Sequence, residues 1–139
     1  MLRRFMEILP RLFVGAPTRA ELSWVRGRLD PGHPNTALVV RIYENLLSTI
    51  DPAKVLVPED ADWLQAGELA GRVAKSLAGA GGQIATAFDR VELISDSLAA
   101  VLASKAGVCV VTEDAHFETL CEFLPGLEVL FYRRVASGA

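Results

Sequence analysis

The sequence predicts an α/β fold in which helices cover both faces of a mostly parallel central sheet, a three-layer α/β/α arrangement. Short apolar runs at residues 11–15, 54–57 and 108–111 are typical of strands. Longer segments between them carry apolar residues at helical spacing. Strands that alternate with helices usually run parallel, because each connection crosses the sheet in a right-handed sense. With 139 residues, the chain is expected to form a single domain over residues 1–139.

The N-terminal elements follow from apolar spacing and turn residues. A short helix is predicted over residues 2–9, before the strand at 11–15. Capping residues and apolar periodicity predict a helix from 18 to about 28. Turn-forming residues fill positions 30–35 and separate this helix from a second one, expected at 36–50.

The C-terminal elements are predicted in the same way. They are a strand at 54–57, a helix at 61–77, a helix that starts near Asp96 and ends at Gly107, a strand at 108–111, a helix at 116–123 and a final strand at 127–132. Glycine suits the position after a helix, where the backbone often turns left-handed. The strand at 108–111 is uninterrupted and apolar, so it is predicted to be covered on both faces, with Cys109 buried. Trp24 and Trp63 are expected in the core.

Composition and charge restrict the class of protein. Net charge is −3, but the first 41 residues carry seven basic and three acidic side chains. These arginines either contact phosphates or form a solvated surface, and the sequence leaves both options open. No apolar run approaches the length that crosses a membrane. The two cysteines form neither a disulfide framework nor a zinc pattern, so a reducing, cytoplasmic location is expected.

Three carboxylates are candidates for chemistry, and each has a local alternative. Asp114 follows the strand at 108–111, and ligands of open α/β sheets bind outside the carboxyl ends of strands. Glu21 can instead pair with Thr18 in a capping box. Asp96 and Asp114 can instead cap the helices that follow them. Local sequence leaves these alternatives open.

Two segments share a family pattern. The first consists of Ser95-Asp96-Ser97-Leu98-Ala99-Ala100, then Gly107, then Thr112-Glu113-Asp114-Ala115-His116-Phe117. This segment resembles the C-terminal half of PIN-domain nucleases, in particular the VapC-type toxins of toxin–antitoxin pairs. The family has an Asn-Asp pair where this chain has Ser95-Asp96. Pro17-Thr18-Arg19-Ala20-Glu21-Leu22 is similar to the family segment that supplies another acidic residue. The likeness covers most of residues 12–132.

The resemblance implies a PIN-like domain with a Mg²⁺ or Mn²⁺ site. It implies that Glu21, Asp96 and Asp114 are the catalytic residues and the metal ligands. Thr112 and Arg19 are then expected to contact or position the RNA substrate. In the family, a first strand ends in Asp, and no such strand precedes residue 11 here. The chain is therefore expected to be N-terminally incomplete relative to the family.

Three functions are compatible with this pattern. The leading hypothesis is a metal-dependent ribonuclease that hydrolyses RNA phosphodiesters as the toxin of a toxin–antitoxin pair, with a cognate antitoxin and a second copy of the chain as protein partners. The alternative is a catalytically silent PIN-fold module that acts by dimer or antitoxin binding. A generic ligand-binding α/β domain of the receiver type is a third option, but the early acidic pair that receivers need is missing.

Overall fold

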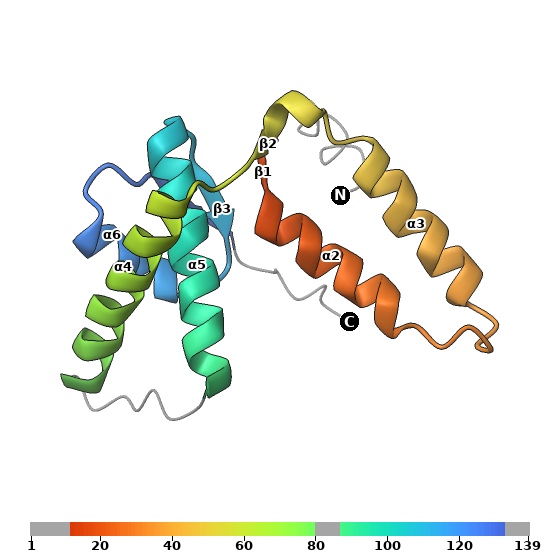
Figure 1. The fold of residues 1–139 in the computed structure, drawn as a ribbon, viewed down its shortest axis with the longest axis horizontal. Helices are drawn as coiled ribbons and strands as arrows, with labels where there is room; N and C mark the ends of the chain where they lie inside the picture. The colour runs from red at the N-terminus through yellow and green to blue at the C-terminus, as the bar shows by residue number, and fades with distance from the viewer. Residues whose placement is uncertain (1–11, 80–86, 133–139) are drawn as a thin grey trace, which may run out of the picture. The chain divides into compact units, whose positions relative to one another are not determined.

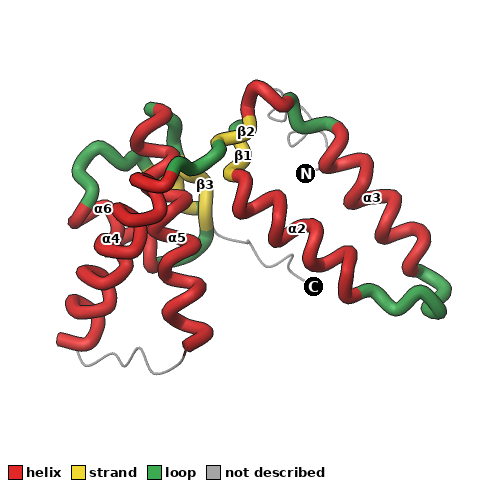
Figure 2. The backbone as a smooth tube through the Cα atoms, viewed as in Figure 1, coloured by secondary structure: helices red, strands yellow, loops and turns green. Residues whose placement is uncertain are grey.

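The computed structural model describes residues 12–79 and 87–132, and the chain divides into two compact units, Met1–Val57 and Pro58–Ala139. The described residues form α-helices and short strands, and the strands pair in parallel (Figures 1 and 2). The prediction of a mixed α/β fold with parallel strands is therefore confirmed. These strands form two separate two-stranded sheets, one in each unit. The predicted helix at 2–9 lies outside the described residues.

The first unit is a helical hairpin carried by a parallel strand pair. Its elements are β1 (Val14–Gly15), α2 (Ala16–Arg28), α3 (Thr36–Ser48), a 3₁₀ turn (Pro52–Lys54) and β2 (Val55–Leu56). Val14 lies opposite Val55 in the strand pair. An ion pair of 3.5 Å between Arg26 and Glu44 links the two helices. No described residue of this unit is buried, so its apolar side chains contribute little hydrophobic stabilisation as they stand.

Two predictions for this unit are wrong. Helix α2 begins at Ala16 with Pro17 in its first turn, and Gly15 is the N-cap residue. Thr18 and Glu21 therefore lie inside the helix and do not form a capping box. Trp24 is 61% exposed, and its indole ring packs under the Arg28 guanidinium, 4.7 Å from the ring centroid. A cation–π contact of this kind lets a tryptophan remain at the surface.

The second unit holds the core. Its elements are α4 (Asp60–Gly79), α5 (Ala87–Ala106), β3 (Val110–Thr112), α6 (His116–Phe123) and β4 (Val129–Phe131). Strands β3 and β4 are parallel, with Val110 opposite Val129, and α6 makes the crossover between them. The small and apolar faces of α4 and α5 pack together, because alanines let the two backbones approach. The fully buried large side chains Val73, Leu98 and Leu120 come from α4, α5 and α6.

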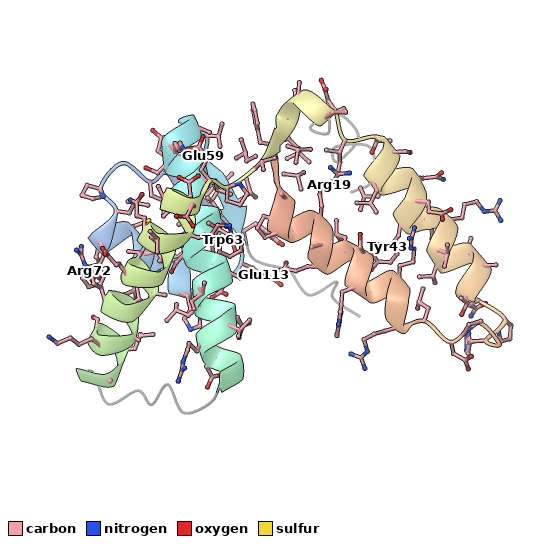
Figure 3. The ribbon with its side chains drawn as sticks, viewed as in Figure 1. Arg19, Tyr43, Glu59, Trp63, Arg72 and Glu113 are labelled. Atoms are coloured by element: carbon pink, nitrogen blue, oxygen red, sulfur yellow. The ribbon has the colours of Figure 1, made fainter. Side chains whose placement is uncertain are left out.

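The beginning of α4 is tied to the end of α5 by a buried carboxylate. Asp62 is only 4% exposed, and its Oδ2 accepts a hydrogen bond of 2.8 Å from the Glu59 backbone N–H. Lys105 donates to Asp62 at 3.1 Å and to Glu59 at 3.0 Å. The Glu59 bond, followed by Lys105, lowers the pKa of Asp62. Asp62 thus lies in the first turn of α4 and accepts from the backbone N–H just before the helix. Trp63, by contrast, is 46% exposed, so its predicted place in the core is wrong (Figure 3).

The end of α5 directs the chain into β3. Gly107 has a φ of 65°, as predicted, and two backbone bonds close the turn: Gly107 N–H to Ser104 C=O and Val108 N–H to Ala103 C=O. This pair of bonds is the Schellman motif. The strand that follows is not covered on both faces, because Val111 is 55% exposed, and Cys109 is exposed as well. Both predictions of burial are wrong, since helices of this unit cover one side of the strand pair only.

Candidate metal centre

The site is built on the turn between β3 and α6. The Thr112 hydroxyl accepts a hydrogen bond from the Asp114 backbone N–H at 3.1 Å. Asp114 Oδ1 in turn accepts one from the His116 N–H at 2.8 Å. Hydroxyl and carboxylate side chains commonly close turns in this way. The Thr112 carbonyl is itself held by the Tyr132 N–H at 3.0 Å, so the turn is anchored to the sheet.

Asp114 therefore does cap the helix that follows it, which was the local alternative to a metal-binding role. Ala115 is the N-cap residue of α6, and it makes no side-chain cap bond. The Asp114 side chain fills that role by accepting from the first residue of the helix. One carboxylate oxygen can accept a second partner, and the other oxygen stays available as well. The contact thus orients the carboxylate and leaves it capacity for a ligand.

Asp96 reaches the same place from α5. The helix begins at Ala87, nine residues earlier, so Asp96 lies in its middle and cannot be its cap. That local alternative is wrong, because the sequence-based start of this helix was set too late. The Asp96 side chain is 22% exposed, and that of Asp114 is 37% exposed. Two partly buried carboxylates from different elements converge here.

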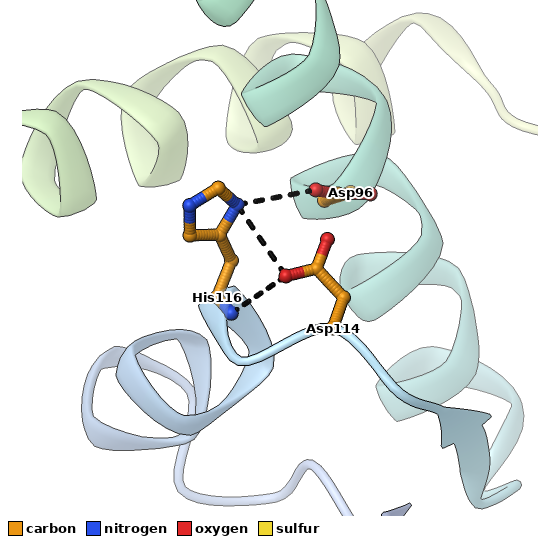
Figure 4. A group of neighbouring side chains, drawn as sticks. All are labelled: Asp96, Asp114 and His116. Carbon is orange, nitrogen blue, oxygen red and sulfur yellow. Dashed lines mark hydrogen bonds and ion pairs between the residues drawn. The ribbon is translucent and has the colours of Figure 1, made fainter. Parts of the chain in front are cut away.

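His116 completes the group, as Figure 4 shows. Its Nδ1 atom lies 3.8 Å from Asp96 Oδ2 and 3.6 Å from Asp114 Oδ1. One ligand atom from each of the three residues lies within 4.8 Å of the others. Carboxylates this close repel each other by about 3.5 kcal/mol at an effective dielectric near 20, and solvent exposure reduces that figure. A bound cation would remove the repulsion.

The donor set fits a divalent cation. Mg²⁺ and Mn²⁺ take oxygen ligands, and Mn²⁺ also accepts imidazole nitrogen. A cation about 2.1 Å from each ligand atom fits between atoms that lie up to about 4.2 Å apart. The two distances to His116 Nδ1, 3.8 and 3.6 Å, are within that limit, whereas the ligand atoms of Asp96 and Asp114 lie within 4.8 Å of each other. Two carboxylates and an imidazole leave positions for solvent and substrate around the ion.

The other predicted site residues lie in different places. Thr112 is at the end of β3, where it supports Asp114 through its hydroxyl. Glu21 and Arg19 are exposed residues of α2 in the first unit (Figure 3, Arg19). The cluster in the second unit thus unites two of the three predicted ligands with one residue that the sequence did not single out. Glu21 is thus an exposed carboxylate on a helix.

Sequence reasoning missed His116, although a signal was present. A Thr-x-Asp turn places the residue two positions after the Asp at the first position of the next helix, where its N–H meets the carboxylate. A side chain at that position is held beside the carboxylate. Zinc-site spacing gives no signal for His116, because it needs a second histidine or cysteine nearby.

Comparisons with known proteins identify no family. Neither the family models nor the curated proteins give a match to this chain.

Among residues 12–79 and 87–132, no helix has the length and apolar character that crossing a membrane requires.

Proposed function

We propose that this chain is a divalent-metal-dependent ribonuclease with a three-layer PIN-type fold, acting as the toxin of a toxin–antitoxin pair. The observation that supports this is the convergence of Asp96 and Asp114, from two elements of the second unit, on one point beside a strand end. Both residues stand in the segments that resemble the PIN pattern. Carboxylate pairs of this kind are suited to a hard divalent cation.

The cation would be Mg²⁺ or Mn²⁺, held by Asp96 and Asp114. When bound, such an ion lowers the pKa of water and offsets the charge that develops on a phosphodiester. The chain's own residues orient the carboxylates. Thr112 fixes the backbone of Asp114, and the His116 N–H fixes its side chain. Because the turn is closed by these bonds, Asp114 loses little conformational freedom when it binds an ion.

Glu21 and Arg19 are the contributions of α2 to this proposal. By the PIN resemblance, Glu21 would be a metal ligand, and Arg19 would contact a substrate phosphate. Both side chains are exposed on a helix whose last turn also carries Arg26 and Arg28. Basic side chains that contact phosphates release counterions, so their effect on binding depends on salt. Arg19→Ala is expected to reduce the slope of log affinity against log salt by about 0.7 for single-stranded RNA.

The test is cleavage of a labelled single-stranded RNA by the purified chain in EDTA, Mg²⁺ or Mn²⁺. We expect cleavage only with a metal ion. Asp96→Asn and Asp114→Asn should each reduce it by about a hundredfold or more, the scale on which loss of a charge-stabilising group usually acts. Glu21→Gln should behave in the same way if α2 supplies the third carboxylate.

The matched control is Glu118→Gln. Glu118 is an exposed carboxylate in the first turn of α6, beside the site and outside the cluster. Its loss should leave cleavage unchanged. Cleavage that persists in Asp96→Asn and Asp114→Asn, or that does not need a metal ion, would contradict the proposal.

Thr112→Val should weaken metal binding by about tenfold, and Thr112→Ser, which keeps the hydroxyl, should not.

A second candidate function is a catalytically silent module that binds an antitoxin or a second copy. Exposed apolar side chains on the hairpin of the first unit favour it, namely Trp24, Leu38 and Ile42 at 61%, 55% and 56% exposed. Exposed apolar groups of this size are common at binding surfaces. This candidate predicts no RNA cleavage under any metal condition, together with self-association that Ile42→Asp weakens.

A further inference from the structure

We propose that His116 is itself a ligand of the metal ion, through Nδ1, and that the site therefore selects Mn²⁺ and similar transition metals over Mg²⁺. This inference rests on the proposed function for the presence of a cation, and it deepens that function by naming the third protein ligand and the class of metal. Neither the carboxylate pattern nor the spacing of histidines in the sequence indicates it.

The first argument is the position of the Nδ1 atom. It is shielded from solvent and has no hydrogen-bond partner among the described residues. It faces two carboxylate oxygens at 3.8 and 3.6 Å, beyond the usual length of an N–H···O bond. A shielded nitrogen that faces two carboxylates without bonding either one is poorly satisfied alone. A cation held by the two carboxylates would give this nitrogen a partner.

The second argument is the orientation of the ring. In Figure 4, Nδ1 is directed toward Asp96 and Asp114, and the other ring nitrogen points away from both. The ring is partly accessible, with 45% of the side chain exposed, so Nε2 can keep its proton and bond water. This tautomer leaves the Nδ1 lone pair for a metal ion.

The third argument is that the ring is held in place before an ion arrives. The His116 N–H is bonded to Asp114 Oδ1, so histidine and carboxylate belong to one closed turn. The next residue, Phe117, is 4% exposed and anchors the start of α6 in the core, and Leu120 does the same one turn later. A ligand group on a packed helix is positioned more accurately than one on a free loop.

A nitrogen ligand changes which metal is preferred. Mg²⁺ is a hard ion that favours oxygen, whereas imidazole suits the first-row transition metals. With two carboxylates and one imidazole, we expect Mn²⁺ to bind more tightly than Mg²⁺. His116→Gln should weaken Mn²⁺ binding by about tenfold or more and change Mg²⁺ binding by less than about threefold.

The experiment uses Mn²⁺ alone as the probe, with the full chain. Electron paramagnetic resonance gives the affinity, and electron spin-echo modulation detects a ¹⁴N nucleus coupled to the bound Mn²⁺. The chain contains two histidines, His33 and His116, so the source of any imidazole signal is resolved by two variants. His33 is an exposed loop residue of the first unit, and His33→Gln is the matched control. We expect the nitrogen coupling to survive in His33→Gln and to disappear in His116→Gln.

Labelling the His33→Gln chain with ¹⁵N-histidine leaves His116 as the one labelled histidine, so the answer does not depend on whether His116→Gln folds. The ¹⁴N modulation should be replaced by that of ¹⁵N. Mn²⁺ that binds without nitrogen coupling overturns this inference and leaves the nuclease proposal intact. Nitrogen-coupled Mn²⁺ in a protein that cleaves no RNA supports the inference and contradicts the nuclease. Absence of Mn²⁺ binding overturns the inference.

Discussion

The substitution Asp114→Asn should stabilise the metal-free protein and abolish its stabilisation by metal ions. Asparagine has nearly the same shape, and its side-chain oxygen can still accept the 2.8 Å bond from the His116 N–H. The substitution therefore keeps the turn and removes one negative charge from the cluster. Loss of a charge from a carboxylate pair relieves repulsion, but it also removes a ligand.

The size of the effect follows from the geometry. The ligand atoms of Asp96 and Asp114 lie within 4.8 Å of each other. Two unit charges at that separation repel by about 3.5 kcal/mol at an effective dielectric of 20 and by about 0.9 kcal/mol in bulk water. Asp114 is 37% exposed, so a value toward the lower end, about 1 kcal/mol, is expected. For a domain of this size, that raises the melting temperature by about 4 °C.

The assay is thermal or urea unfolding, with and without Mn²⁺. In EDTA, Asp114→Asn should be the more stable protein. With Mn²⁺ at about a hundred times its dissociation constant, the wild type should gain about 2.7 kcal/mol and become the more stable one. This reversal of order is the signature of a metal ligand.

The matched control is Asp51→Asn. Asp51 accepts a bond of 2.9 Å from the Ala53 N–H, the same local geometry as Asp114, but it is not part of the carboxylate cluster. Its substitution should leave both stabilities unchanged. If Asp114→Asn were less stable than the wild type in EDTA, or responded to Mn²⁺ to the same extent, the electrostatic argument would be refuted.

Three further predictions concern the fold of the second unit. Leu98→Ala should lower the free energy of urea unfolding by about 2–5 kcal/mol, because Leu98 is fully buried and its removal leaves a cavity; a loss below 1 kcal/mol would contradict that packing. Ser97→Ala should raise it by about 1 kcal/mol, because the fully buried Ser97 hydroxyl has no hydrogen-bond partner among the described residues. The hydrogen bonds to Glu59 and then Asp62 raise the pKa of Lys105 above 10.5. The bonded ammonium therefore stabilises the fold fully below that pH, and this stabilisation is lost as the pH rises through the folded-state pKa. The urea midpoints of wild type and Lys105→Met should therefore differ at neutral pH and converge as the pH rises through the folded-state pKa of Lys105; a constant difference would show that the charge of Lys105 is not the cause.

Much of the second unit was predictable because its signals are local. The glycine after α5, the strand that follows and the helix at His116–Phe123 all depend on residues within one or two turns of each other. Gly107 takes the left-handed conformation that few other residues tolerate. The turn at Thr112 and Asp114 is closed by side chains that reach two residues along the chain. Such contacts depend on neighbouring residues in the sequence and not on the tertiary fold.

Burial was predicted less well because it depends on partners far along the chain. Trp63 and Val111 have the apolar character of core residues, yet they are 46% and 55% exposed. The apolar run around Val111 was taken to be covered on both faces, and helices of its unit cover only one. Asp62 shows the reverse case: a carboxylate is buried at 4% exposure because Lys105, from a different helix, and a backbone N–H both bond it.

The candidate metal centre combines both kinds of signal, and this explains which of its residues the sequence predicts. Asp114 was identified from its place after a strand, a local feature. Asp96 was identified from a family pattern, but its local explanation as a cap failed because the start of α5 lies at Ala87. His116 requires both conditions at once: the turn that fixes its ring and the passage of α5 beside that turn. Since the second condition is tertiary, spacing rules for histidine ligands cannot detect it. A carboxylate that caps its helix two residues before a histidine is therefore worth testing in three dimensions, because the turn already brings together two of the three residues of the cluster.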